Sequence, residues 1–430
     1  MGRPTPRPRR PRQPRRVPAA DVASLSALSG VFRYRNAKIF YSGSIVCWTG
    51  SWVQRIATDW LAWELTHSAF WVGVLAFATL IPSIVISPLA GAYADRLDRV
   101  RLVMVSEFIA SAQAAALVAL VLTGQIRIEY MVALAFINGA AETFAQPARQ
   151  CLLPGLVDRQ FLPGAVALNS LTYNIARFIG PAMSGPMIVM WGVVPSIALN
   201  GIAFLYAAVT MAMLRLDPGI RRGIRSSHSV LHDAIEGVRY VSRHKGIGPI
   251  LLFAATAGMT LRSIPELLPP YVSVLFGRGA EGLAVLTSAM GVAAMAGGFW
   301  IAIRGRVEGL TTVALVAVGV LIGGCTLFVA TGSFEVAIIA IIVMGASTPT
   351  HGISIQTLLQ NASSTGMVGR VLSLWGMITR AAPAIGALLY GTASEFAGLR
   401  IPVFVGCALC LCMWVYTWRR RKAIAAALEG

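Results

Sequence analysis

The chain has 430 residues, of which 56% are hydrophobic and 13% are charged, and its mean hydropathy is +0.69. A soluble protein normally contains ~25% charged residues, so this composition predicts an integral membrane protein. The formal net charge of +18 is typical of nucleic-acid-binding proteins, but no polar domain is long enough to carry such a surface. The cations instead indicate the basic cytoplasmic loops of a multi-pass membrane protein.

Residues 1–38 form a basic segment that precedes the first long apolar run. They hold ten arginine or lysine residues and six prolines, and they contain no apolar core of signal-peptide length. This composition predicts a disordered cytoplasmic tail. Two roles stay open: attraction to anionic lipid, or an inert extension that helps to fix the orientation of the chain.

Long apolar runs recur along the rest of the chain, each close to the ~20 residues that cross a bilayer as a helix. Twelve spans are predicted, at residues 39–65, 70–93, 102–124, 130–146, 165–191, 194–214, 247–276, 282–303, 310–331, 336–358, 371–393 and 401–418. An even number of spans places both termini on one side. With that side as the cytoplasm, 29 of the 36 lysine and arginine residues lie in inside segments and three lie in outside loops. This asymmetry predicts cytoplasmic termini in a protein of the cytoplasmic (inner) membrane.

The longest polar interruption divides the spans into two groups of six. The predicted fold class is therefore an all-α integral membrane protein with two six-helix bundles, residues 39–214 and 247–418. Residues 215–246 form a central cytoplasmic loop, where apolar residues at helical spacing near 230–241 predict an amphipathic helix on the membrane surface. Residues 419–430 form the cytoplasmic C-terminus.

Two patterns of charged residues recur in both halves at nearly the same offset, which predicts pseudo-symmetry between the bundles. Span 1 contains Arg55 and Asp59, and span 7 contains Arg262 and Glu266. The i,i+4 spacing would put both members of each pair on one helix face. Two interpretations stay open: self-neutralising structural pairs, or charged groups that line a central cavity.

Span 5 contains Arg177 and span 11 contains Arg380, neither with an acidic residue within four positions. A charge inside the bilayer costs ~2.5–3.5 kcal/mol to insert, so it normally faces a polar cavity or a partner. We expect both arginines near the membrane midplane, facing the substrate cavity from opposite halves.

Two carboxylates within spans lack a local basic partner. Glu142 has no basic residue between Tyr130 and Pro147, and we expect it to carry the coupling proton. Glu107 lies near the cytoplasmic end of its own span and is expected to stay hydrated. A salt bridge from Glu142 to a neighbouring helix, for example to Arg177, is the structural alternative.

A dense charge cluster lies between spans 2 and 3, where Gly91, Asp95, Arg96 and Arg99 follow the pattern G-x-x-x-D-R-x-x-R. In this position the pattern resembles the signature loop of the major facilitator superfamily of transporters. The resemblance implies a conformational lock, in which Asp95 meets the start of span 11 and Arg149 at the end of span 4. Free N–H groups at a helix start favour a carboxylate.

Span 5 also carries Gly180, Pro181, Ser184 and Gly185, which bend a helix and permit close packing. The segment resembles the helix-5 motif of the superfamily's exporters, and residues 146–157 are similar to the branch of enterobactin exporters and macrolide efflux proteins. This resemblance favours export by antiport over uptake, although a packing seam is the structural alternative. The arginine that many exporters carry in helix 4 is missing from residues 137–142.

Three prolines fall in span 7, at positions 265, 269 and 270. Proline removes a backbone donor and bends a helix. The outer half of this span is therefore predicted to be interrupted, as in helices that line cavities or gates.

These predictions combine into a secondary transporter that exports a small amphipathic molecule, such as a drug or siderophore, in exchange for protons. A lipid or lysophospholipid flippase and an uptake carrier are alternatives on the same fold, and a non-transporting membrane receptor or scaffold is the alternative of another class. The sequence has no phosphate-binding loop of the Walker type and no metal-ligand cluster. We therefore expect no enzymatic activity, cofactor, metal or nucleic-acid partner. The expected partners of the monomer are a small-molecule substrate, protons and the lipid bilayer.

Overall fold

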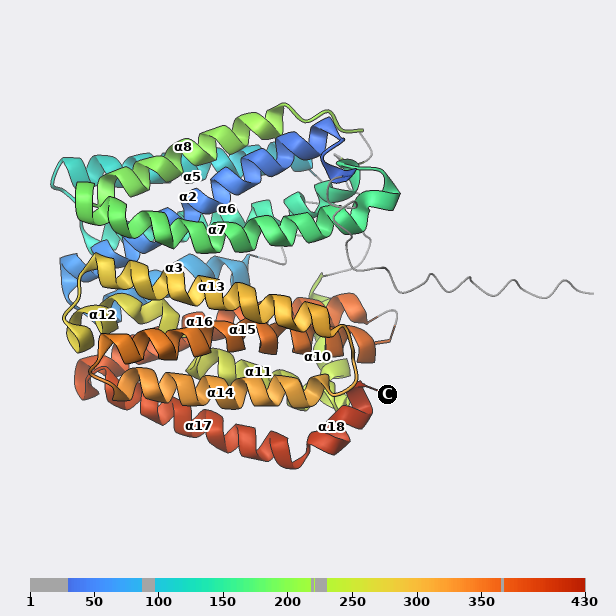
Figure 1. The fold of residues 1–430 in the computed structure, drawn as a ribbon. Helices are drawn as coiled ribbons and strands as arrows, with labels where there is room; N and C mark the ends of the chain where they lie inside the picture. Colours follow the sequence, from blue (N-terminus) through green and yellow to red (C-terminus); the bar gives the residue numbers. More distant parts are fainter. Residues whose placement is uncertain (1–29, 87–96, 218–219, 221–229, 365–366, 430) are drawn as a thin grey trace, which may run out of the picture.

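The computed structural model describes residues 30–86, 97–217, 220, 230–364 and 367–429, without the side chains of residues 230–235. All of its long elements are helices (Figure 1). The first half comprises α2 (Arg35–Thr66), α3 (Ala69–Val85), α5 (Arg99–Leu122), α6 (Ile128–Leu152), α7 (Leu162–Trp191) and α8 (Val193–Ala212). After α10 (Val230–Arg243), the second half comprises α11 (Ile247–Thr260), η3 (Ile264–Leu267), α12 (Leu268–Phe276), α13 (Ala280–Arg304), α14 (Leu310–Ala330), α15 (Phe334–Ala362), α16 (Val368–Ala397), α17 (Arg400–Arg419) and α18 (Arg421–Leu428).

The predicted all-α membrane fold is confirmed. Eight of the described helices, with residues 247–276 counted as one, are long and apolar enough to cross a membrane. Each of the twelve predicted spans overlaps one described helix or, for span 7, the pair α11 and α12. The number of membrane crossings and the domain boundaries stay predictions.

Local sequence explains where several helices begin and turn. The Asp98 carboxylate accepts from the backbone N–H groups of Val100 and Arg101 at 3.0 and 3.2 Å, which satisfies donors that the first turn of α5 leaves free. Gly192, with φ of +77°, makes the sharp turn from α7 to α8, a backbone conformation that glycine adopts without strain.

Span 7 is interrupted, as its prolines predict. α11 ends at Thr260, the 3₁₀ turn η3 contains Pro265, and α12 begins with Leu268, Pro269 and Pro270. The break occurs where the helix approaches the first half, because η3 contacts α3 and α12 contacts α2. It therefore brings irregular backbone to the boundary between the halves.

The two halves stack beside one another, with α2 to α8 in the upper part of Figure 1 and α11 to α17 in the lower part. We call the end that carries α10, α18 and the start of α2 the inner end, and the opposite end the outer end. The halves meet mainly through α3 against α16 and α7 against α13. In both pairs the helices run side by side along the boundary.

Glycines allow these interfacial helices to touch backbone to backbone. A Cβ added to Gly73 of α3 would lie 2.6 Å from the Ala387 carbonyl oxygen, and one on Gly391 of α16 would lie 2.5 Å from that of Ala69. Such distances leave no room for a larger residue. These contacts lie in the outer half of the bundle, whereas a Cβ on Gly369, at the inner start of α16, would have no described neighbour within 4 Å.

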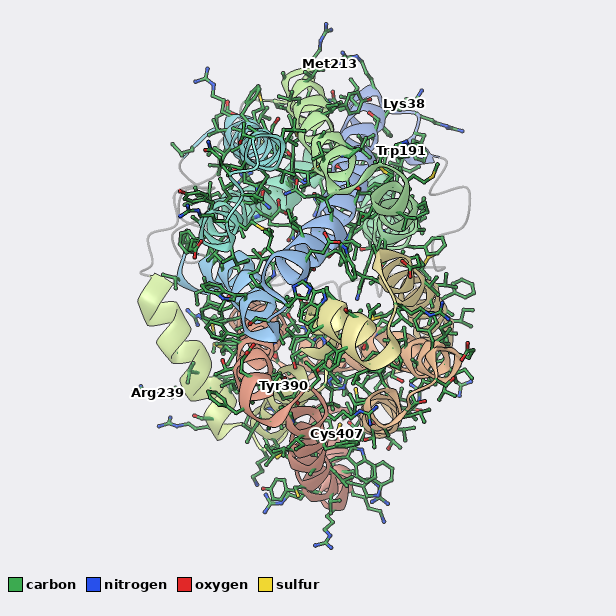
Figure 2. All side chains as sticks on the ribbon, turned by 90° about the vertical axis from the view of Figure 1, so that its left-hand side faces the viewer. Lys38, Trp191, Met213, Arg239, Tyr390 and Cys407 are labelled. Atoms are coloured by element: carbon green, nitrogen blue, oxygen red, sulfur yellow. The ribbon has the colours of Figure 1, made fainter. Side chains whose placement is uncertain are left out.

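The predicted helix in the central loop is present as α10 and packs mainly on the second half, against α16 and α11. In Figure 2, which views the molecule from its outer end, α10 lies on the flank of that half and Arg239 points away from it. Glu236 of α10 pairs with Arg370 of α16 at 3.1 Å. The placement of α10 on a membrane surface stays a prediction.

Candidate functional site

A narrow cavity with about 60 Å³ of room for water-sized molecules lies between the two halves. It is formed by α2 and α7 from the first half and by η3 and α13 from the second. Its lining residues are Trp52, Arg55, Ile56, Asp59, Arg177, Pro181, Pro265, Glu266, Thr287, Met290 and Gly291. Four charged residues predicted from the sequence therefore meet at one site, and the mixture of charged, aromatic and aliphatic groups suits an amphipathic molecule.

An ion pair bridges the halves inside this cavity. Arg55 of α2 donates through Nη2 to Glu266 Oε2 of η3, and the two side chains are 35% and 15% exposed. The Arg55 Nε also lies 3.9 Å from Asp59 Oδ2, one helical turn away. Arg55 therefore takes part in two ion pairs, one with Asp59 within α2 and one with Glu266 of the other half.

The predicted i,i+4 relation of Arg262 to Glu266 on one helix face is wrong. The α-helix ends at Thr260, before Arg262, and Glu266 lies in the 3₁₀ turn that follows. Spacing of four residues places side chains together only along a continuous α-helix. Glu266 instead pairs with Arg55 of the other half.

Arg177 of α7 enters the cavity beside an aromatic wall. Its guanidinium carbon lies 5.6 Å from the centroid of the Trp52 ring, and that of Arg55 lies 5.3 Å from the same ring. Both distances are in the range of cation–π attraction. No described carboxylate forms a salt bridge with Arg177. Trp52, one helical turn before Arg55, is a cavity residue that the charge pattern of the sequence does not reveal.

Arg380 is an exposed residue of α16. It forms no ion pair with a described residue, and it is not among the residues that line the cavity described above. Its predicted position facing a central substrate cavity therefore stays a prediction.

A second charge cluster lies inside the first half. Arg149 of α6 donates through Nη2 to Glu107 Oε1 of α5, and the two side chains are only 5% and 1% exposed. The thiol of Cys47 on α2 approaches Glu107 Oε2 at 3.6 Å and Arg149 Nη2 at 3.8 Å. Glu142, half-buried on α6, is close enough to interact electrostatically with all three groups.

The expectation that Glu107 stays hydrated is wrong, because the packing of α5, α6 and α2 closes over it. Arg149, predicted at the cytoplasmic end of span 4, lies within α6, which continues through Pro147 to Leu152 and buries it. Glu142 has neither a hydrogen bond nor a salt bridge to any described residue, so its alternative salt bridge to Arg177 is absent in this structure.

The residues of the predicted lock lie partly outside the described structure. Gly91, Asp95 and Arg96 are not described. Arg99 starts α5 and donates through Nη1 to the Ile220 carbonyl oxygen at 2.9 Å, which ties the inner end of α5 to the central loop. The lock stays a prediction, in which Arg149 would have to serve both Asp95 and Glu107.

The helix-5 motif packs α7 onto both halves. A Cβ on Gly180 would lie 2.3 Å from Trp52 Cβ of α2, and one on Gly185 would lie 1.9 Å from Ala284 Cβ of α13. Ser184 is fully buried and donates to the Val53 carbonyl oxygen at 2.9 Å. Pro181 lines the cavity. The motif thus holds the cavity wall in place, and the described residues contain no cluster suited to a metal ion.

Comparison with known proteins gives a consistent pattern. The sequence model of a family described as "Transmembrane secretion effector" matches residues 26–427. The chain is 30% identical to the staphyloferrin A transporter of Staphylococcus aureus over 175 residues, 40% of this chain and 44% of that one. It is 22% identical to macrolide efflux protein A of Streptococcus pyogenes over 391 residues, 89% of this chain and 96% of that one. The solved structure of a bacterial homologue of the human lysosomal transporter Spinster, inward-facing and unoccupied, matches with a TM-score of 0.68 at 13% identity, over 95% of this chain and 100% of that one.

Proposed function

Because the chain belongs to the transmembrane secretion effector family of the major facilitator superfamily, we propose that it exports a small amphipathic molecule across the cytoplasmic membrane in exchange for protons. Its relatives include a macrolide efflux protein that aligns over most of both chains. That likeness supports export over uptake. The positive-inside distribution of lysine and arginine supports cytoplasmic termini.

The cavity between the halves is the observation that carries this proposal. A transporter of two rocking halves must expose one site to either side of the membrane in turn. Here the cavity is lined by residues of both halves, and the Arg55–Glu266 pair joins them across it. A rocking motion would therefore change the contacts of the substrate and of the ion pair together.

Proton coupling is proposed to run through Glu142. A carrier must gain and lose a proton as its access to water changes. Glu107 is held by Arg149, whereas Glu142 is half-buried beside this pair and has no described hydrogen-bond or ion-pair partner of its own. A carboxyl group without a fixed cation is free to exchange its proton, which favours Glu142 over Glu107 as the carrier.

The test is transport into inverted membrane vesicles that contain the full chain. Three dansyl probes share one fluorophore and differ in charge: anionic dansylglycine, neutral dansylamide and cationic dansylcadaverine. We expect at least one probe to accumulate, beyond its passive accumulation in vesicles that lack the protein, only while the vesicle interior is acidic, and to lose this excess when nigericin collapses the pH gradient. Accumulation that is independent of the gradient contradicts antiport, and accumulation only in right-side-out vesicles indicates an uptake carrier.

The role of Glu142 is tested by Glu142→Gln, which mimics the protonated side chain. Gradient-driven accumulation should be lost, while exchange of probe down its own gradient should continue. Glu281→Gln is a matched control, because Glu281 lies in the first turn of α13, away from both charge clusters. Gradient-driven transport that persists in Glu142→Gln places the proton path elsewhere.

A further inference from the structure

The charges at the central cavity do not balance. Arg55, Arg177, Asp59 and Glu266 line it, and Arg262 is close enough to interact electrostatically with Arg177 and Glu266. Three guanidinium groups thus face two carboxylates, so this part of the described structure carries an excess of one positive charge with both carboxylates ionised. Protonation of either carboxyl would increase the excess.

Both carboxylates already have a partner in Arg55. Glu266 accepts its hydrogen bond, and Asp59 lies 3.9 Å from its Nε atom. Neither carboxylate forms a salt bridge with Arg177. Across the boundary, Arg262 is close enough to Arg177 for the two like charges to repel each other. Of the two arginines that line the cavity, Arg177 is therefore the one without a salt bridge to a described carboxylate.

An uncompensated cation within a membrane protein is costly unless water or an anion meets it. The Arg177 guanidinium lines the cavity, and its planar fork of donors matches carboxylate and sulfonate oxygens in pairs. A bound anion would neutralise the excess charge, whereas a bound cation would add to it.

Aromatic surface lies next to this guanidinium. Trp52 contacts Arg177 through the face of its ring, and Tyr173, one helical turn before Arg177 on α7, packs edge-on against Trp52 with ring centroids 6.4 Å apart. Ile56, Pro181 and Met290 supply further apolar lining. The site thus pairs one anion-binding group with a broad apolar wall.

We propose that the central cavity selects amphipathic anions, with the acidic group of the substrate bound by Arg177 and its apolar body against Trp52. This inference rests on the proposed function and adds to it the charge class of the substrate. In this proposal Arg177 of the first half determines the charge of the substrate that binds, whereas the Arg55–Glu266 pair joins the two halves.

The experiment compares equilibrium binding of the same three dansyl probes to the full chain in lipid nanodiscs, read from energy transfer between tryptophan and dansyl, with empty nanodiscs subtracted. Dansylglycine should bind about tenfold or more tightly than dansylcadaverine, because one hydrogen-bonded charge pair changes affinity by at least that factor. In Arg177→Gln this ratio should fall to about threefold or less, and Arg177→Lys, which keeps the charge but loses the planar fork of donors, should restore only part of it.

Arg420→Gln is the matched control. Arg420 also lies over an aromatic ring, that of Tyr416 at 4.7 Å, but it is located at the inner end of α17. It should leave the charge preference unchanged, and thermal unfolding should show that all three variants are folded. Binding of dansylamide or dansylcadaverine as tight as that of dansylglycine overturns the inference, as does an unchanged ratio in Arg177→Gln. Gradient-driven export of dansylcadaverine by the same protein would leave the proposed function standing.

Discussion

The Arg55–Glu266 ion pair is expected to hold the outer end of the transporter closed, and Arg55→Gln should weaken that closure. Exposed pairs contribute about 0.2–1 kcal/mol, and breaking a fully buried pair costs about 3–5 kcal/mol. The side chains here are 35% and 15% exposed, so we assign roughly 1–3 kcal/mol, discounted for solvent screening. At 1.36 kcal/mol per factor of ten, the closed-to-open ratio should fall by about 5-fold to 150-fold.

The assay measures the distance between spin labels at the outer end, using Gln125→Cys in the first half and Phe396→Cys in the second, where both residues are exposed. Cys151 and Cys412 are first changed to serine, because the other four cysteines are buried. In Arg55→Gln the population with the longer distance should grow. Glu266→Gln should have the same effect, because it removes the other half of the same contact.

Two further variants make the result specific to this pair. The double exchange Arg55→Glu with Glu266→Arg should restore much of the short-distance population. Arg278→Gln should change nothing, since Arg278 lies over the Phe334 ring within the second half. Identical distance distributions in the parent protein, Arg55→Gln and Glu266→Gln would refute the reasoning.

Three further predictions concern contacts toward the inner end of the protein, and each is measured as a shift in the midpoint of thermal unfolding. Arg149→Gln should be strongly destabilising, by about 3–5 kcal/mol, because it leaves the buried Glu107 carboxylate without its cation. Adding Glu107→Gln should recover most of the lost stability, and a double variant as unstable as Arg149→Gln contradicts the pairing. Glu429→Gln should cost about 1 kcal/mol, because the carboxylate caps the start of α14 by accepting from the N–H groups of Gly309 and Thr311 at 2.6 and 2.7 Å; an unchanged midpoint contradicts this cap. Burial lowers the pKa of the His244 imidazole below its ordinary 6.5, and its Nδ1 accepts from the N–H groups of Gly246 and Ile247. The neutral imidazole therefore stabilises the folded protein fully above pH 6.5, and this stabilisation is lost as the pH falls through the lowered pKa. The midpoint difference between the parent protein and His244→Ala should therefore shrink from about pH 8 to about pH 5, and a difference independent of pH contradicts the assignment.

The sequence was sufficient to predict the helices and the break in span 7. Apolar runs of membrane length leave few alternatives to helices, because every backbone polar group in lipid must be satisfied internally. The prolines after Thr260 cannot continue a regular helix, and the structure has a 3₁₀ turn there. Both predictions depend on local chemistry, which is visible in one stretch of chain.

Pairing between helices was not predictable in the same way. Pro147 and the end of the apolar run suggested that span 4 stops before Arg149, but α6 continues past the proline. Tertiary packing against α5 then buries Arg149 with Glu107, a partner 42 residues earlier. The same limit applies to Glu266, whose partner Arg55 lies 211 residues away in the other half. Local spacing cannot rank such contacts against a neighbour four positions away.

Helix α2 connects the two charge clusters and so gives them a common mechanical element. Its Cys47 contacts the Glu107–Arg149 pair, and its Arg55 contacts Glu266. Eight residues of helix separate these positions by about 12 Å. Between them Gln54 is buried and accepts from the Asn200 amide of α8 at 2.7 Å, which ties α2 to its own half. Because α2 is a rigid helix held in this way, its cavity end cannot move independently of its inner end. Protonation beside Glu107 and substrate binding beside Arg55 therefore both act on the position of α2.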